Sequence, residues 1–150
     1  ERSIMNYFNK EKLKNTKIKY LPSGEETKNS YFANTTKRAP KKIKRDPSRL
    51  FISFRPAENI KNEISVTNGY EFKLKGLVKA KSGKKAYDLF SKGKFAWVVD
   101  GKDEAKLIIT MKKASRLMII GNTKNGDQTT DHYSMMGFTK AYNTAKKTCS

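Results

Sequence analysis

Much of this chain alternates hydrophobic and polar residues with a period of two, the pattern of strands that bury one face. In Tyr70-Glu71-Phe72-Lys73-Leu74-Lys75, the three apolar side chains are expected on one side of a strand. Short apolar runs bounded by glycine, proline or asparagine predict further strands. The predicted strands cover residues 30–35, 50–54, 63–66, 70–75, 77–78, 86–90, 95–99, 117–121 and 129–136.

Turn signals separate these runs. Asn68-Gly69 predicts a tight turn before residue 70, and Asn125-Gly126 predicts the tip of a hairpin that joins residues 117–121 to 129–136. Asn-Gly favours a type I′ turn, in which both central residues have positive φ. A two-residue hairpin loop is therefore expected at Asn125-Gly126.

Three segments predict helices instead. Residues 103–113 begin with acids and end with lysines, which suits the helix dipole. Residues 137–147 place Phe138 and Tyr142 on one face of a closing helix. Residues 3–14 predict a short amphipathic helix, interpreted as docked on the domain, with a membrane-surface anchor as the alternative.

The order of these elements predicts a mostly β protein. Many short strands, two helices in the C-terminal half and no βαβ alternation favour a β-sandwich-like domain, because each strand can then bury one face. We assign residues 1–29 to an N-terminal extension, partly helical, and residues 30–150 to the β-sandwich-like domain. At 150 residues the chain suits one domain with its own core.

The charge balance points to anionic partners. The formal net charge is +19, and such a field attracts nucleic acid, anionic lipid headgroups, acidic polysaccharide or an acidic protein. The chain has many more lysines than arginines, whereas base recognition favours arginine. We therefore expect any nucleic-acid binding to be salt-sensitive and non-specific. No apolar run is long enough to predict a transmembrane helix.

The most basic segment runs from Lys37 to Arg49. Pro40 and Pro47 predict a loop here, because proline interrupts regular structure. The segment is either a binding loop for an anion or partner, or a solvated connector in a protein that is basic throughout. The candidate binding residues are Lys37, Arg38, Lys41, Lys42, Lys44, Arg45 and Arg49.

Catalytic and metal-binding patterns are weak. His132 is the single histidine, and its neighbour Asp131 is expected on the opposite face of a strand, which disfavours a catalytic triad with Ser134. One histidine and Cys149, the single cysteine, do not form a recognised metal-ligand set. We predict no catalytic residue, metal or cofactor. Trp97 is interpreted as a core residue rather than a stacking surface.

Several landmarks taken in order resemble one bacterial family. From about Arg45 to Cys149 the chain is similar to the invasion-associated locus B family of small exported alphaproteobacterial proteins. The landmarks are Arg45-Asp46-Pro47, Arg55-Pro56-Ala57-Glu58-Asn59, Asn62-Glu63-Ile64-Ser65-Val66, Gly69-Tyr70, Leu89-Phe90, Ala96-Trp97, Met111-Lys112, Ile120-Gly121, Thr130-Asp131-His132-Tyr133-Ser134, Gly137-Phe138 and the near-terminal cysteine.

The resemblance implies a non-enzymatic, mostly β binding or envelope protein, located in the periplasm or at the cell surface. Its expected partner is an acidic protein or an anionic surface. The alternative is a basic subunit of a large protein or nucleoprotein assembly. Many relatives carry a second cysteine near the position of Ser30-Tyr31, which this chain lacks.

Overall fold

A computed structural model describes residues 16–20, 29–34, 37–55 and 60–149 of the chain. Within them, the strands form one antiparallel sheet in the order β1-β2-β4-β5-β8-β7-β6-β9-β10-β3. The strands are β1 (Thr16–Tyr20), β2 (Asn29–Asn34), β3 (Lys37–Ala39), β4 (Arg49–Arg55), β5 (Ile60–Thr67), β6 (Leu77–Ser82), β7 (Lys85–Lys92), β8 (Phe95–Trp97), β9 (Arg116–Asn122) and β10 (Gln128–Ser134). The helices are α2 (Gly101–Lys113) and α3 (Phe138–Cys149).

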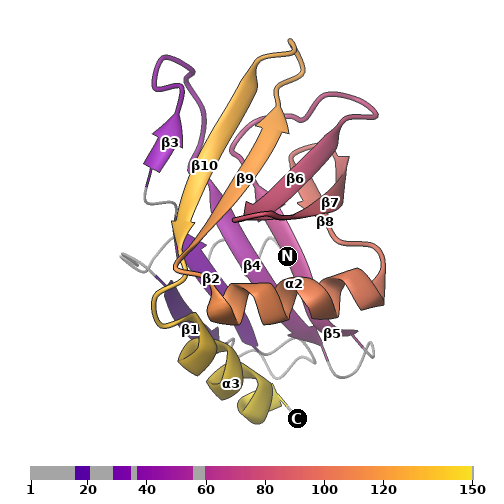
Figure 1. The fold of residues 1–150 in the computed structure, drawn as a ribbon. Coiled ribbons are helices and arrows are strands. Elements are labelled where there is room, and N and C mark those ends of the chain that lie inside the picture. The colour runs from indigo at the N-terminus through magenta and orange to yellow at the C-terminus, as the bar shows by residue number, and fades with distance from the viewer. Residues whose placement is uncertain (1–15, 21–28, 35–36, 56–59, 150) are drawn as a thin grey trace.

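The sheet curls so that its two ends face each other (Figure 1). β10 and β2 are far apart in the hydrogen-bonded order, yet they come into contact. α2 lies across the inner side of the curl against β5 and β7, and α3 packs against β1, β2 and β4. The prediction of a mostly β protein is confirmed. The strands pack face to face, as in a β-sandwich-like domain, because one continuous sheet curls on itself. β1, within the predicted extension, belongs to that sheet.

The core fills the inside of the curl. Strands contribute every second residue, which is the face that a period of two predicts, and the helices contribute one stripe each. The buried hydrophobic residues of this core include Leu50, Ile52, Ile64, Val66, Val78, Ala80, Leu89, Ala96, Leu107, Ile108, Met111, Leu117, Ile119, Tyr133, Phe138 and Tyr142.

Both predicted helices in the C-terminal half are confirmed. The Asp100 side chain caps α2 by accepting from the Lys102 amide at 2.8 Å, while acids occupy the first turn and lysines the last. This arrangement satisfies free amides and complements the helix dipole. The predicted helix at 3–14 lies outside the described residues.

The strand predicted at residues 70–75 is not formed. Phe72 makes one isolated bridge with Thr123, and its amide donates to Gly93 instead of a regular ladder. Lys75 has φ +58°, which turns the chain away, so Leu74 is 81% exposed. Tyr70 and Phe72 do point inward as their spacing predicted.

The β9–β10 hairpin is present, but its predicted type I′ turn is wrong. Of the two central residues only Gly126 has positive φ, at +96°. The Gly126 amide donates to the Thr123 carbonyl at 2.8 Å, and the Thr123 amide donates to the Asp127 carbonyl. The loop is therefore longer than two residues. This loop length fixes the register that pairs Ser134 with Arg116 and His132 with Met118, and a slip of one residue would invert both faces.

Two further interpretations need correction. The segment from Lys37 to Arg49 is not wholly a loop, because residues 37–39 form β3 on β10 and Arg49 begins β4. Trp97 is not part of the core. Ala96 takes the buried position of β8, and Trp97 lies on the outer face of the sheet against Phe90.

Candidate functional site

A buried ion pair fixes the predicted binding loop to the sheet. Arg45, in the loop between β3 and β4, donates two hydrogen bonds to Asp131 of β10: Nη2 to Oδ1 at 2.5 Å and Nη1 to Oδ2 at 3.0 Å. Their side chains are 1% and 0% exposed. A planar guanidinium matches a carboxylate in this two-bond geometry, so Arg45 and Asp131 neutralise each other inside the fold.

Other polar groups complete this buried cluster. Arg45 Nη1 also donates to the Asn68 carbonyl at 3.1 Å, and its guanidinium lies 5.7 Å from the centre of the Tyr70 ring. The Tyr70 hydroxyl bonds to Thr129 at 2.6 Å, and burial raises the pKa of this tyrosine. Buried polar groups with such partners specify one arrangement of the chain.

Gly69 allows the turn before Tyr70 to approach the loop. Its φ is +78°, and a Cβ there would lie 1.9 Å from the Asp46 carbonyl oxygen. The Asp46 amide donates to the Gly69 carbonyl at 3.0 Å. Only glycine suits this position, because both the backbone conformation and the close approach exclude a side chain.

The arginines of the predicted site therefore have structural positions. Arg38 donates to the Asp46 carbonyl at 2.6 Å, and Arg45 is buried. Arg49, the first residue of β4, is half-buried, and burial lowers its pKa. The prediction that Arg45 binds an external anion is wrong, since its guanidinium has no access to solvent.

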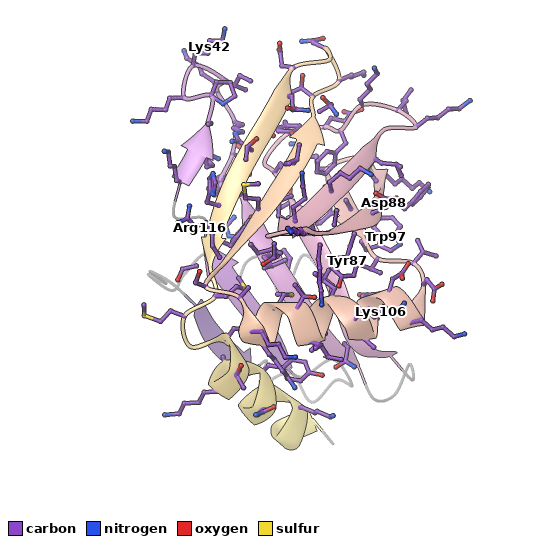
Figure 2. All side chains as sticks on the ribbon, viewed as in Figure 1. Lys42, Tyr87, Asp88, Trp97, Lys106 and Arg116 are labelled. Carbon is purple, nitrogen blue, oxygen red and sulfur yellow. The ribbon has the colours of Figure 1, made fainter. Side chains whose placement is uncertain are left out.

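The lysines of the same segment are exposed. Lys41, Lys42 and Lys44 lie in the loop after β3, and Figure 2 shows Lys42 at its tip. Lys37, at the start of β3, is exposed at the edge of the sheet. The structure thus separates the predicted residues into arginines that are buried or partly buried and lysines that are exposed.

Lys37 lines a surface pocket of about 310 Å³ with Ser115, Arg116, His132 and Ser134. We call this set the cationic pocket. Register brings its members together: His132 pairs with Lys37 across β10 and β3, and Ser134 pairs with Arg116 across β10 and β9. Ser115 directly precedes β9, and its carbonyl accepts from the Met135 amide at 3.0 Å.

The chemistry of the cationic pocket favours anions. Lys37 and Arg116 carry full positive charges, the two serines supply hydroxyl donors, and no carboxylate is among the lining residues. A guanidinium beside hydroxyls can bind a carboxylate, sulfate or phosphate with charge-assisted hydrogen bonds. The volume is at the small end for ligand sites, so it suits one anionic group.

The sequence singled out only part of this pocket. Lys37 was a predicted binding residue, whereas His132 and Ser134 were considered only for catalysis, and Arg116 and Ser115 were missed. The expected opposition of Asp131 and His132 is confirmed, since Asp131 is buried inside and His132 lies on the outer side. The alternation along β9 could have identified Arg116 as an outward-facing cation, because Leu117 and Ile119 face inward.

Within the described part of the chain, no group of three or more histidine, cysteine, aspartate or glutamate side chains could hold a metal ion. Neither α2 nor α3 has the length and apolar character needed to cross a bilayer. Comparison with protein families, curated proteins and solved structures found no match to this chain.

Proposed function

We propose that this protein is a non-enzymatic binding protein that engages an acidic protein partner or an anionic surface. The observation that carries this proposal is the cationic pocket, where Lys37 and Arg116 converge without a neighbouring carboxylate among its lining residues. In a chain of net charge +19, the pocket offers a defined docking point within a long-range attractive field.

The exposed loop lysines extend this surface. Lys41, Lys42 and Lys44 follow β3, which is the edge strand that carries Lys37. Lysines on an edge strand also discourage pairing with other chains. Exposed ammonium groups on this loop, in addition to the pocket, favour a partner with many negative charges, such as an acidic protein or an anionic lipid surface.

The proposal includes export to the periplasm or cell surface, as the resemblance to the invasion-associated locus B family implies. Its support is that landmarks distant in sequence serve one purpose in the fold. Arg45, Gly69, Tyr70 and Asp131 belong to three of those landmarks, and they meet in the buried cluster. Residues that jointly specify a fold are those a family with this fold would share.

Charge reversal in the cationic pocket tests the proposal. We expect the double variant Lys37→Glu/Arg116→Glu to weaken binding of a fluorescent polyglutamate peptide, or of vesicles rich in anionic phospholipid, by about tenfold or more. The control Lys84→Glu/Lys106→Glu makes the same change of net charge at exposed positions outside the pocket. It should weaken binding about two- to threefold, since distant surface charges are screened at physiological salt.

An equal loss in both double variants would show that net charge alone binds the probe, and would contradict a site in the pocket. The alternative, a basic subunit of a nucleoprotein assembly, is separated by the same measurement. A single-stranded oligothymidylate that binds more tightly than polyglutamate at equal charge would favour that alternative. Recovery of the chain in a periplasmic or surface fraction tests the export proposal.

A further inference from the structure

Three apolar side chains form a continuous row on the outer face of the sheet. Leu77 of β6 pairs with Phe90 of β7, and Phe90 pairs with Trp97 of β8. Phe90 and Trp97 meet edge to face with ring centres 5.6 Å apart. We call Leu77, Phe90 and Trp97 the apolar row.

The apolar row is not part of the core. Leu77 and Phe90 are each 51% exposed, Trp97 is partly buried, and none of the three belongs to the buried cluster inside the curl. Single exposed apolar residues are ordinary. Three in direct register on adjacent strands form a contiguous surface, which in soluble proteins marks an interaction site.

Lysines flank this row on the same face. Lys79 lies two residues after Leu77 and Lys92 two residues after Phe90, so both point outward with them. The one nearby acid on these strands, Asp88, pairs with Lys79 at 2.6 Å. On β6, β7 and β8 the outward-facing charge around the row is therefore net positive.

The cationic pocket opens on the same face of the sheet. His132 pairs with Met118 of β9, Met118 with Lys81 of β6, and Lys81 with Ala86 of β7. From β3 to β8 there are five strand intervals, or roughly 24 Å at the usual spacing. Figure 2 shows Arg116 and Trp97 at opposite lateral ends of this part of the sheet, on the left and on the right of the view.

We propose that the apolar row docks an acidic polypeptide whose hydrophobic side chains cover Leu77, Phe90 and Trp97 while its carboxylates meet the flanking lysines. This inference rests on the proposed function and names the partner class. Aromatic side chains surrounded by charge of one sign are typical of protein interfaces with a complementary partner. An extended segment of about seven residues spans the distance to the cationic pocket.

Charge and ring geometry favour this partner over two others. A second copy of the chain, at +19, would be repelled. Stacking of nucleic-acid bases needs open ring faces. Phe90 and Trp97 instead meet edge to face, which occupies one ring face of the pair, and Leu77 has no ring.

Trp97 is the single tryptophan, so its fluorescence reports directly on the row. The probes are two synthetic twelve-residue peptides with equal numbers of glutamates. One carries leucine and phenylalanine between the acids, and the other carries serine. We expect the apolar-acidic peptide to bind about tenfold more tightly and to shift the Trp97 emission to the blue, because the indole loses contact with water.

The variants Leu77→Ser and Phe90→Ser should remove this tenfold preference and leave binding of the serine peptide unchanged. Ile109→Ser is the matched control. Ile109 is also 51% exposed but lies on α2, away from the outer face. This variant should keep the full preference. Circular dichroism checks that each variant is folded.

Equal affinities for the two peptides would overturn this inference and leave the proposed function intact. Failure of both peptides to bind would overturn this inference and also contradict an acidic protein as the partner in the proposed function. A single-stranded oligothymidylate that quenches Trp97 and binds more tightly than either peptide would overturn the inference in favour of nucleic acid. Loss of the preference in Ile109→Ser would also count against it.

Discussion

At the scale of single residues, arginine and lysine occupy different environments in the segment from Lys37 to Arg49. Arg45 is buried against Asp131, and Arg38 bonds to the backbone of Asp46. Lys41 and Lys42 remain exposed. The physical reason is that a guanidinium is weakly hydrated and presents several fixed donors, whereas an ammonium is strongly hydrated.

The Arg45–Asp131 pair gives the first prediction. Asp131→Asn leaves a buried guanidinium without its counter-charge, so we expect the free energy of unfolding to fall by about 3 kcal/mol. Asp88→Asn is the matched control, because it breaks the Lys79–Asp88 pair, in which both side chains are about half exposed. That loss should stay below about 1 kcal/mol. Urea unfolding followed by circular dichroism measures both.

A similar loss in the two variants would contradict the structural role given to Asp131. Sequence alone could not single out this pair, because Arg45 and Asp131 are 86 positions apart. Arg45 has the same local signature as the exposed cations beside it. Burial, which distinguishes them, is a property of the folded chain.

At the scale of elements, Glu104 links α2 to β5. Its Oε2 accepts from the Ile64 amide at 2.9 Å. Burial raises the pKa of Glu104 from 4.5 to about 7, and the nearby charge of Glu63 adds to the rise. The helix is therefore docked on the sheet by a carboxyl that gains its charge within the physiological range of pH.

This pKa gives the second prediction. The folded state holds the proton of Glu104 more tightly than the unfolded chain does, so its contribution to stability is greatest below about pH 4.5 and is lost as pH rises to about 7. Glu104 is partly exposed, which limits the effect to the order of 1 kcal/mol. Glu104→Gln should remove this loss, because its amide oxygen still accepts from Ile64.

Melting temperatures of the native chain and Glu104→Gln between pH 5 and pH 8 test the point. The variant should be the more stable at pH 8, and the two curves should approach each other at pH 5. Parallel curves would mean that Glu104 does not titrate in this range.

The β9–β10 hairpin shows what local signals determine about elements. Its position follows from Asn125-Gly126 and the flanking alternation. Its register does not follow from them, because Asn125 and Gly126 lie within a longer loop that is closed by the hydrogen bond between Thr123 and Asp127. Residues 70–75 show the same limit: their alternation predicted that Tyr70 and Phe72 face inward, but Leu74 is 81% exposed and Phe72 bonds outside a regular ladder.

At the scale of the whole molecule, the net charge of +19 opposes the compact state. We predict that the melting temperature of the isolated protein rises by several degrees between low and physiological ionic strength, because salt screens this repulsion. Differential scanning calorimetry measures it. A fall in melting temperature would mean that ion pairs outweigh the repulsion. Binding of an acidic partner should show the opposite trend and weaken with salt.

The sequence by itself determined the mostly β class, the two helices of the C-terminal half and the faces of most strands. These follow from hydrophobic periodicity and from the charges at helix ends, which act within a few positions. Tertiary structure alone decided the single curled sheet, the burial of Arg45 against Asp131, the outward position of Trp97 and the cationic pocket. Each depends on strand order and register, which bring together residues that no local pattern connects.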